Sequence, residues 1–581
     1  MKKLYVTLIL FLFFSSGFLF GQNPLVKQWD KRFGGTGNDE LFSFQQTSDG
    51  GFILGGFSSS GINGDKTQNI WGSAGDRDYW IVKIDSLGNK QWDKDFGGIY
   101  YDYLTSLLQT ADGGYILGGS SLSGISGDKT QANWDTICNP GCTNDYWIVK
   151  IDSSGNTQWD KDFGGTSWDY LTSLIQTDDG GYLLGGYSKS GITGNKSQPN
   201  WDSTGISYDY WIIKIDSLGS KQWDKVFGGT SWDYLSSLQQ TFEGGYILGG
   251  NSYSNISGDK TQPLWDTCTN CPAKVDYWIV KIDSLGNKQW DKDFGGSDLD
   301  YFSSLQQTAD RGYILGGKSR SGISGDKTQS IWDTCSNCFF KGDFWIVKID
   351  SLGNKQWDRD FGGTLDEDEF ENITQTTDGG YLIAGSSYSP ISGNKTENNL
   401  GEEQTWIVKT DSLGIIQWDK TIFTTGHDEL GRAIQLNNGC YAVANSTYGG
   451  IGGYKTQPNW DTASFPYTTP DYWIIKFCDT TFTTSLTPAL SKGEEVAIAP
   501  NPFTNDITVT IQNHPEPSGI KHATFTVKNI LGQIVFTFSQ VPNFGKGFYG
   551  QTLNLSFLSK GIYLLEATID NERIVKKIVK E

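Results

Sequence analysis

The sequence predicts an all-β protein: a seven-bladed β-propeller of four-stranded blades, followed by a small C-terminal β-sandwich. Three observations lead to this prediction. The stretch DYWIVKIDSLGNKQWDKDFGG at 78–98 recurs along the chain with small changes. Glycine is abundant, at 73 of 581 residues, and aromatic residues make up 14%. The repeat is also out of phase at the two ends of the array. Repeated short strands of this composition are typical of propellers.

Residues 1–21 have the pattern of a secretory signal peptide. Lys2 and Lys3 form a basic start, 4–14 is apolar, and 15–21 contains small residues. No cysteine follows the apolar core, so a lipoprotein anchor is not indicated. No later stretch stays apolar for the ~18 residues that a transmembrane helix needs. We therefore expect an exported protein without a transmembrane segment.

Each repeat contains signals for four antiparallel strands. In the third repeat, two strands at 171–177 and 182–188 flank the turn DDGG, a strong hairpin signal. A DYWIIKID strand and a KQWDK strand follow. Seven strands of the last kind recur every 61 to 67 residues, beginning at Trp29, Trp92, Trp159, Trp223, Trp290, Trp357 and Trp418.

The two ends of the array indicate a closed ring. The first recognisable strand, 28–33, is of the fourth type, and the last repeat stops after its third strand at Phe477. The N-terminal strand can therefore complete the last blade and remove an exposed sheet edge. We assign 22–480 to the propeller, 481–495 to a polar linker and 496–581 to the C-terminal domain.

Charge and residue usage narrow the classes of function. The net charge of −20 and pI near 4.6 argue against binding to nucleic acid or to anionic membrane surfaces. His427 is the sole histidine of the predicted propeller, and there is no G-x-S-x-G or P-loop motif. A histidine-based triad or histidine-rich metal site is thus disfavoured. Carboxylate pairs for glycoside hydrolysis remain open, because Asp and Glu are abundant.

Eight cysteines in an exported chain favour disulfides. Zinc is the alternative for the two C-x-x-C pairs, and free thiols are the third. Cys440 starts the second strand of the last blade and Cys478 ends the third, so antiparallel pairing would bring them together. The other candidate pairs are local: Cys138 with Cys142, Cys268 with Cys271, and Cys335 with Cys338.

Two repeated features lie on the face that carries the long loops. The first is the motif G-[DN]-K-[TS]-Q-x-x-W between the second and third strands. Its tryptophans would either stack on a ligand such as a sugar ring or pack each loop onto its blade. Blade 6 has Leu400 at this position. The six candidates are Trp71, Trp134, Trp201, Trp265, Trp332 and Trp460.

The second feature is an Asp ten residues before each hairpin turn, near the predicted mouth of the central channel. A ring of carboxylates would bind a cation such as Ca²⁺, whereas a repeated Asp in a turn commonly caps backbone N–H groups. We predict no other cofactor. The acidic run 366–369 is a second candidate for a cation or partner. The seven ring positions are Asp39, Asp102, Asp169, Asp233, Asp300, Asp368 and Asp428.

The C-terminal segment resembles a known family. The matching pieces are APNPF at 499–503, VKNILGQ at 527–533, KGIYLL at 560–565 and the closing strand 573–580. They resemble the C-terminal sorting domain of type IX secretion substrates. The resemblance implies export across both membranes of a Gram-negative cell, the type IX machinery as partner, and cleavage of the tail. The repeats resemble quinoprotein-like and delta-60-type propellers.

The sequence therefore predicts a secreted or cell-surface propeller that binds a glycan or a protein, as an adhesin or scaffold, without catalysis. Two alternatives stay open. One is an enzyme that acts on extracellular polysaccharide through Asp and Glu of the long-loop face. The other is a purely structural surface protein. Near-identical blades favour binding or structure, because an enzyme needs unlike residues in one pocket.

Overall fold

We analysed a computed structural model of the chain, which separates into two compact units, one spanning most of the propeller and one the C-terminal region. The predicted signal peptide and the cysteines at 138, 142, 268, 271, 335 and 338 lie outside the described residues. The structure describes the propeller over 25–135, 143–265, 274–332, 342–367, 369–461 and 469–479. Of the C-terminal domain it describes the seven strands between 495 and 580 and a few residues that follow the strand ending at Asn554.

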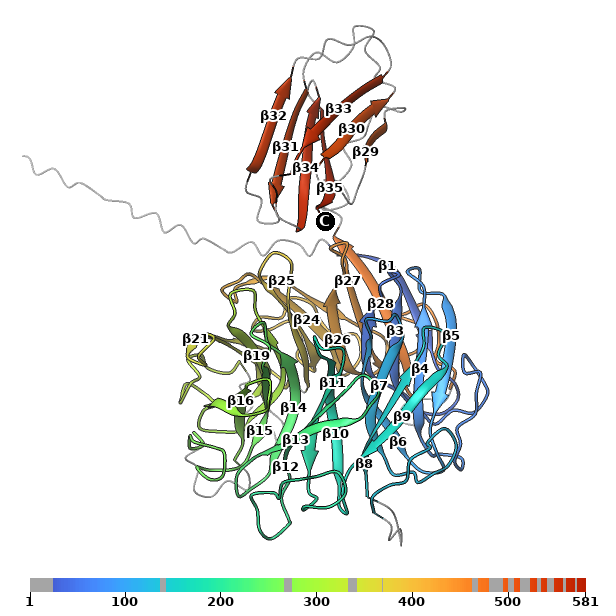
Figure 1. Cartoon of the computed structure of the whole chain (residues 1–581), viewed down its shortest axis with the longest axis vertical. Helices are drawn as coiled ribbons and strands as arrows, with labels where there is room; N and C mark the ends of the chain where they lie inside the picture. Colours follow the sequence, from blue (N-terminus) through green and yellow to red (C-terminus); the bar gives the residue numbers. More distant parts are fainter. Residues whose placement is uncertain are drawn as a thin grey trace, which may run out of the picture. The chain divides into compact units, whose positions relative to one another are not determined.

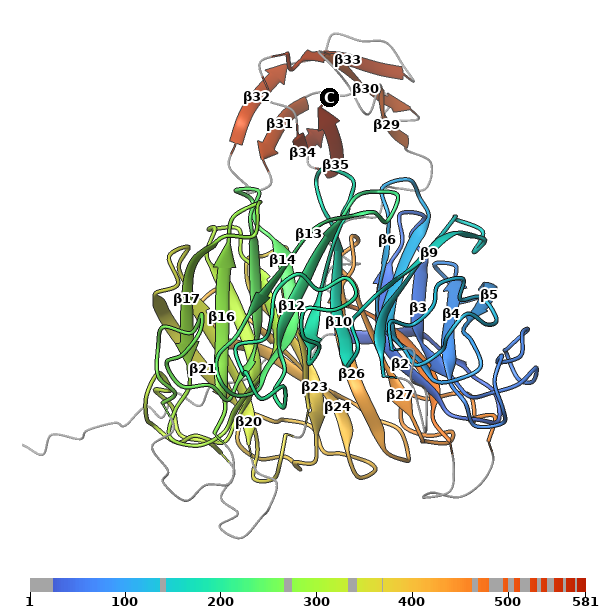
Figure 2. The ribbon, with the colours of Figure 1, turned by 60° about the horizontal axis from the view of Figure 1, so that its bottom comes forward.

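Seven four-stranded antiparallel sheets form the described part of the propeller, arranged around a central axis (Figures 1 and 2). In blade 1 the strands are β2 (Asp39–Gln46), β3 (Phe52–Ser58), β4 (Asp78–Ile84) and β5 (Lys90–Phe96). We call these positions A to D, from the axis outward. Blades 2 to 6 are β6–β9, β10–β13, β14–β17, β18–β21 and β22–β25, and blade 7 is β26–β28 with β1.

The remaining strands repeat the pattern of blade 1. Their bounds are Asp102–Gln109, Tyr115–Ser121, Asp145–Ile151 and Thr157–Phe163 for β6–β9; Asp169–Gln176, Tyr182–Ser188, Asp209–Ile215 and Lys221–Phe227 for β10–β13; Asp233–Gln240, Tyr246–Ser252, Asp276–Ile282 and Lys288–Phe294 for β14–β17; Asp300–Gln307, Tyr313–Ser319, Asp343–Ile349 and Lys355–Phe361 for β18–β21; Phe370–Gln375, Tyr381–Ser387, Gln404–Thr410 and Ile416–Ile422 for β22–β25; and Asp428–Gln435, Tyr441–Thr447 and Asp471–Asp479 for β26–β28.

Sequence chemistry explains the order of the strands in a blade. Strand β4 is buried at every position and, like the other C strands, is rich in aromatic and β-branched residues. The D strands, such as β5, contain exposed and half-buried residues as well as buried ones, as outer strands should. Between blades, the Tyr79 ring lies 4.9 Å from that of Trp147, and its hydroxyl donates to the Trp147 carbonyl at 3.1 Å. This Tyr–Trp contact joins blade 1 to blade 2.

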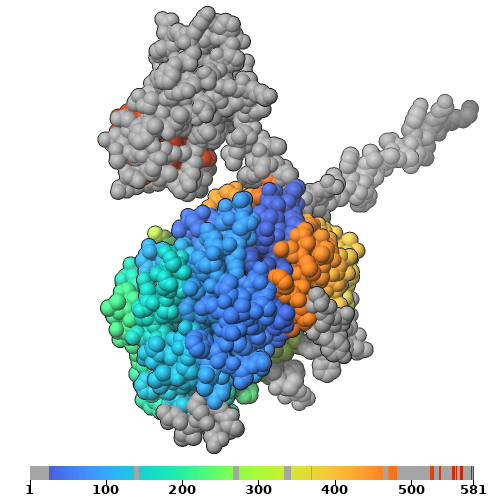
Figure 3. Space-filling view, turned by 90° about the vertical axis from the view of Figure 1, so that its right-hand side faces the viewer, coloured from blue at the N-terminus to red at the C-terminus, as the bar shows by residue number. Residues whose placement is uncertain are grey.

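The N-terminal strand closes the ring, as the sequence predicted. Strand β1 (Leu25–Phe33) pairs with β28 and becomes the outer strand of blade 7. Figure 3 shows the N-terminal segment beside the last part of the propeller. Asp30 accepts hydrogen bonds from the Trp473 indole at 3.1 Å and from the Thr456 N–H at 2.9 Å. Asp160 makes the equivalent bond to Trp147 in blade 2.

Cys440 and Cys478 are disulfide-bonded. They flank the register pair Tyr441 and Phe477 of strands β27 and β28. Both cysteines are buried, at 8% exposure. The bond therefore joins the two strands of blade 7 next to the closure, where the sequence placed it.

The C-terminal unit is a small β-sandwich. Its two sheets have the strand orders β29-β30-β33 and β32-β31-β34-β35. Phe525 and Leu565 of the larger sheet and Leu553 of the smaller one are buried, at 2% exposure or less. The strands are Glu495–Ala499, Asp506–Gln512, Ala523–Asn529, Ile534–Gln540, Phe548–Asn554, Gly561–Ile569 and Glu572–Lys580 for β29 to β35.

We expect Asp30→Ala to open the ring. The change leaves the N–H groups of Thr456 and Trp473 without their carboxylate and weakens the hold on β1. The expected cost is about 2–4 kcal/mol, because hydrogen bonds to charged groups contribute more than neutral ones. Asp160→Ala, the matched change in blade 2, should cost a similar amount without freeing a strand. Urea unfolding and light scattering test this: association should increase for Asp30→Ala alone, and equal behaviour would contradict the closure.

We expect the double variant Cys440→Ala/Cys478→Ala to fold with reduced stability. The disulfide closes a loop of about 40 residues, so its removal should cost roughly 3–4 kcal/mol in the chain-entropy model. The midpoint of urea unfolding measures the loss. Reduction with a thiol should lower the midpoint of the unmodified protein further than that of the double variant. An unchanged midpoint in the double variant would show that the bond does not stabilise the closing blade.

Candidate functional site

The loop tryptophans connect neighbouring blades. The backbone N–H of Trp71 donates to the Asp78 carboxylate at 2.7 Å, which holds the loop on blade 1. The Trp71 indole donates to Asp128 of blade 2 at 2.7 Å. Its ring also covers Gly127, whose φ of 56° suits glycine and where a Cβ would lie 2.7 Å from the ring.

The same arrangement recurs around the ring. The indole of Trp201 donates to Asp259 at 2.7 Å, and that of Trp460 donates to Asp65 at 2.8 Å. Each of these Asp residues belongs to the G-D-K motif of the following blade. These tryptophans therefore pack against the following blade as well as holding their own loop. The six tryptophans are still 40–52% exposed, so their role as a ligand platform stays a prediction.

The repeated Asp residues are buried backbone caps. Asp102 is fully buried and accepts hydrogen bonds from the Gly98 N–H at 2.8 Å and the Ser123 hydroxyl at 3.0 Å. Burial raises its pKa to about 6, although the hydrogen bonds oppose the shift. The same bonding holds the carboxylates of Asp39, Asp169, Asp233 and Asp300.

Blades 6 and 7 vary this cap. In blade 6 the Gly363 N–H donates to Glu367, one residue before Asp368, which lies outside the described residues. In blade 7 the Thr424 hydroxyl donates to Asp428 at 2.8 Å. Asp366 forms an ion pair with Lys318 at 2.8 Å. Two carboxylates of the acidic run are therefore bound within the propeller, and Ca²⁺ binding by the Asp ring stays a prediction.

A second set of buried carboxylates was not singled out from the sequence. In every blade except the sixth, the Asp that begins the C strand, such as Asp78, is fully buried and accepts the N–H of the loop tryptophan. Burial raises the pKa of Asp78 to about 7 and that of Asp209 to about 8. The repeated D-Y-W motif was a usable signal, since Asp is unfavourable in a strand unless its side chain caps a loop.

The central channel contains a cavity of about 520 Å³. Serines from the middle of the A strands line the inner part of the cavity, including Ser43, Ser173 and Ser304. Nearer the long-loop face, the lining includes Tyr234 and Tyr301, which directly follow the Asp caps. The residues that follow the caps, and not the caps themselves, therefore determine the chemistry of the mouth.

The mouth has an aromatic side formed by blades 3 and 4. The Tyr187 ring lies 5.3 Å from Tyr170, 5.3 Å from Tyr208 and 4.9 Å from Tyr234. Two tryptophans extend this cluster at its edge. Trp168 stacks on Tyr170 at 5.9 Å, and Trp232 contacts Tyr253 at 6.0 Å while remaining 42% exposed. We call these seven residues the aromatic arc.

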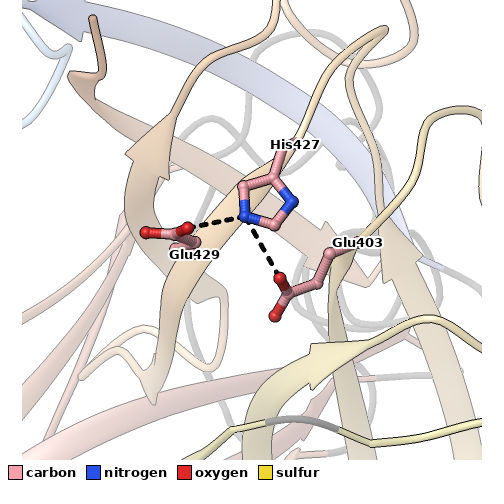
Figure 4. A group of neighbouring side chains, drawn as sticks. All are labelled: Glu403, His427 and Glu429. Atoms are coloured by element: carbon pink, nitrogen blue, oxygen red, sulfur yellow. Dashed lines mark hydrogen bonds and ion pairs between the residues drawn. The ribbon is translucent and has the colours of Figure 1, made fainter. Parts of the chain in front are cut away.

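The opposite side, formed by blades 6, 7 and 1, is charged. Glu40, Glu369 and Glu429 take the place that Tyr234 has in blade 4, after the cap position. His427 lies between two carboxylates: its Nε2 is 2.6 Å from Glu429 Oε1 and 3.2 Å from Glu403 Oε2 (Figure 4). Burial lowers the pKa of His427, but the Glu429 hydrogen bond and the Glu403 charge outweigh it, so that the pKa is raised above 6.5.

Comparison with known proteins identifies the C-terminal unit. Residues 497–581 match the family model of the secretion system C-terminal sorting domain. The C-terminal unit is a type IX sorting domain. The protein is therefore exported to the surface or exterior of a Gram-negative cell, and this domain engages the secretion machinery. No helix among the described residues is long and apolar enough to cross a membrane.

Other proteins show distant similarity to this chain. Regulatory protein FlaEY of Caulobacter vibrioides is 27% identical over 232 residues, 39% of this chain; the match covers 23% of that protein's length. The WD40 domain of Neurospora crassa Pan2 has 9% identity and a TM-score of 0.39, covering 75% of this chain and 89% of its own. Apocarotenoid oxygenase of Synechocystis has 10% identity and a TM-score of 0.35, covering 72% and 87%. The fold assignment rests on the seven sheets themselves.

We expect the free energy of unfolding to fall as the pH rises from about 3.5 to about 7. The folded state keeps protons on the buried caps that the unfolded chain has already released. A carboxyl whose pKa rises from 3.8 to about 6, such as Asp102, contributes roughly 3 kcal/mol over this window. Urea unfolding at several pH values measures the slope, and Asp102→Asn should reduce it. A slope of the opposite sign would contradict the buried caps.

Proposed function

We propose that this exported propeller is a non-catalytic binding protein. Its ligand, for which a glycan is the first candidate, binds at the mouth of the central channel. The asymmetry of the mouth is the observation that carries the proposal. Near-identical blades build the scaffold, while the residues at the mouth differ from blade to blade. A site for an asymmetric ligand needs such unlike contacts.

The aromatic arc has the chemistry of a sugar-binding surface. Flat rings stack against the C–H faces of sugars, and phenol hydroxyls both donate and accept hydrogen bonds. Asn251 and Ser236 of the cavity wall supply further polar groups beside Tyr234. The cavity of about 520 Å³ lies within the range of small-ligand sites. These features favour a glycan over a flat protein surface.

The charged side of the mouth supports binding more than catalysis. The Arg432 guanidinium lies 2.7 Å from the Glu371 carboxylate within the cavity wall, which engages this acid in an ion pair. A polysaccharide-acting enzyme needs one protonated and one ionised carboxyl on either side of a glycosidic bond. A protein ligand and a purely structural role remain the alternatives that the experiment below separates.

The test is a glycan array probed with the purified protein, followed by titration of each selected glycan. Trp232→Ala at the edge of the aromatic arc should weaken binding at least about tenfold, which corresponds to roughly 1.4 kcal/mol. Trp134→Ala, in a loop between blades, is the matched control. If Trp134→Ala has the larger effect, the ligand platform is the ring of loop tryptophans instead.

Two further outcomes decide between the classes of function. Release of reducing sugar from a bound polysaccharide would replace the binding proposal with an enzyme. A blank array would reject the glycan, and the search would turn to surface proteins of the cell exterior. Incubation with cells and fractionation would show whether the exported propeller stays attached as an adhesin or is released.

A further inference from the structure

We propose that Glu403, His427 and Glu429 form a binding site for a divalent transition-metal ion, Zn²⁺ by the nature of the ligands. The site lies on the charged side of the channel mouth. It is separate from the Asp positions considered from the sequence and does not depend on whether the channel binds a glycan. Among the described residues, these three form the one group whose ligand atoms all lie within 4.8 Å of one another.

The convergence of the carboxylates is the first argument. Both approach the same ring atom, His427 Nε2, instead of being shared between the two ring nitrogens (Figure 4). One N–H group points in one direction and makes one well-aligned hydrogen bond. Two carboxylates around one imidazole nitrogen thus share a single proton. An ion between these atoms would instead contact all three ligands.

The second argument is the rigidity of the three positions. The Asp428 N–H donates to the Glu403 carbonyl at 3.1 Å, and the Tyr448 N–H donates to the His427 carbonyl at 2.9 Å. The first bond joins the end of the blade 6 loop to strand β26 of blade 7, and the second holds the residue before β26 to the residue after β27 within blade 7. Glu403 is 2% exposed and His427 13% by side chain, so the ligands are partly dehydrated and held before any ion binds.

The third argument comes from the other blades. The bond from Asp300 to Val275 and that from Arg320 to Leu299 repeat the two backbone contacts of this site between blades 4 and 5. Val275 and Leu299 therefore occupy the places of Glu403 and His427, and Tyr301 that of Glu429. Blade geometry does not require charged residues here. Glu429 shares its place with Glu40 and Glu369, but a glutamate at the Glu403 place and a histidine at the His427 place occur at this junction alone among the seven.

The ligand set favours Zn²⁺ over the alkaline-earth ions. Ca²⁺ and Mg²⁺ prefer oxygen ligands alone, whereas imidazole nitrogen together with carboxylate oxygen suits Zn²⁺ and its neighbours in the first transition row. Three protein ligands leave a fourth position of a tetrahedral ion unfilled. Glu429 is 34% exposed by side chain and takes the place of cavity-lining Tyr301. The fourth position would thus be reachable from the channel.

The experiment is calorimetric titration of the full chain, without a polyhistidine tag, using Zn²⁺ and then Co²⁺. We expect one ion per chain with micromolar or tighter affinity, and a visible Co²⁺ absorption band stronger than that of the six-coordinate aqueous ion. His427→Gln and Glu403→Gln should each weaken binding at least about tenfold, or 1.4 kcal/mol. Circular dichroism of each variant shows whether it folds. If one of these two variants does not fold, Glu429→Gln, which changes the most exposed ligand, takes its place in the titration.

Matched controls distinguish this site from other metal binding. Glu243→Gln, an exposed acid in a turn between A and B strands, should leave the affinity unchanged. Cys268→Ser and Cys335→Ser test the C-x-x-C alternative and should also leave it unchanged. Loss of binding in the cysteine variants, or binding that survives His427→Gln, would overturn the assignment. Failure to bind Zn²⁺ below millimolar concentration would reduce the group to an ion pair.

Discussion

The packing of one blade on the next is the constraint on which the rest of the structure depends. A Tyr at the start of each typical C strand places its ring against the Trp of the following blade and donates to its carbonyl. Tyr146 with Trp211 and Tyr472 with Trp80 repeat the contact, the latter across the closure. All four of these aromatic side chains are fully buried, so their positions fix the angle between blades. The angle between blades in turn determines where the loops and the lining of the channel lie.

The contact weakens where the mouth becomes charged. Phe344 replaces the Tyr between blades 5 and 6, and stacks on Trp406 without a hydroxyl to donate. Between blades 6 and 7 the position is Thr405, which instead accepts a hydrogen bond from Asn445 at 2.9 Å. The neighbouring Gln404 replaces the buried Asp of the other C strands. The junction that departs most from the repeat is the one that holds Glu403, His427 and Glu429.

Two kinds of buried carboxylate have a structural role in the propeller, which distinguishes them from the residues of the proposed sites. Caps such as Asp102 hold a turn at the start of an A strand, and residues such as Asp78 hold a loop tryptophan. Their charge is costly to bury, which raises their pKa, and their hydrogen bonds offset that cost. Repetition in the sequence marks such structural groups. The sites that we propose lie instead in residues that are not repeated, the aromatic arc and the cluster of Glu403, His427 and Glu429.

The amino-acid sequence was sufficient to predict the architecture. Strand type follows from local residue pattern, and the offset of the first and last repeats requires β1 to complete blade 7. It also located the Cys440–Cys478 bond and the sorting domain. These inferences succeed because they depend on chain order and short-range periodicity, which can be read directly from the sequence.

Only the tertiary structure decided which residues meet at the channel. The indole of Trp71 reaches Asp128 of the next blade, a contact over 57 positions that no motif within one repeat reveals. Tyr187 gathers its ring neighbours from blades 3 and 4. Glu403 and His427 meet because adjacent blades bring a loop end beside a strand start. Such groupings depend on the angle between blades, which arises from packing around the whole ring.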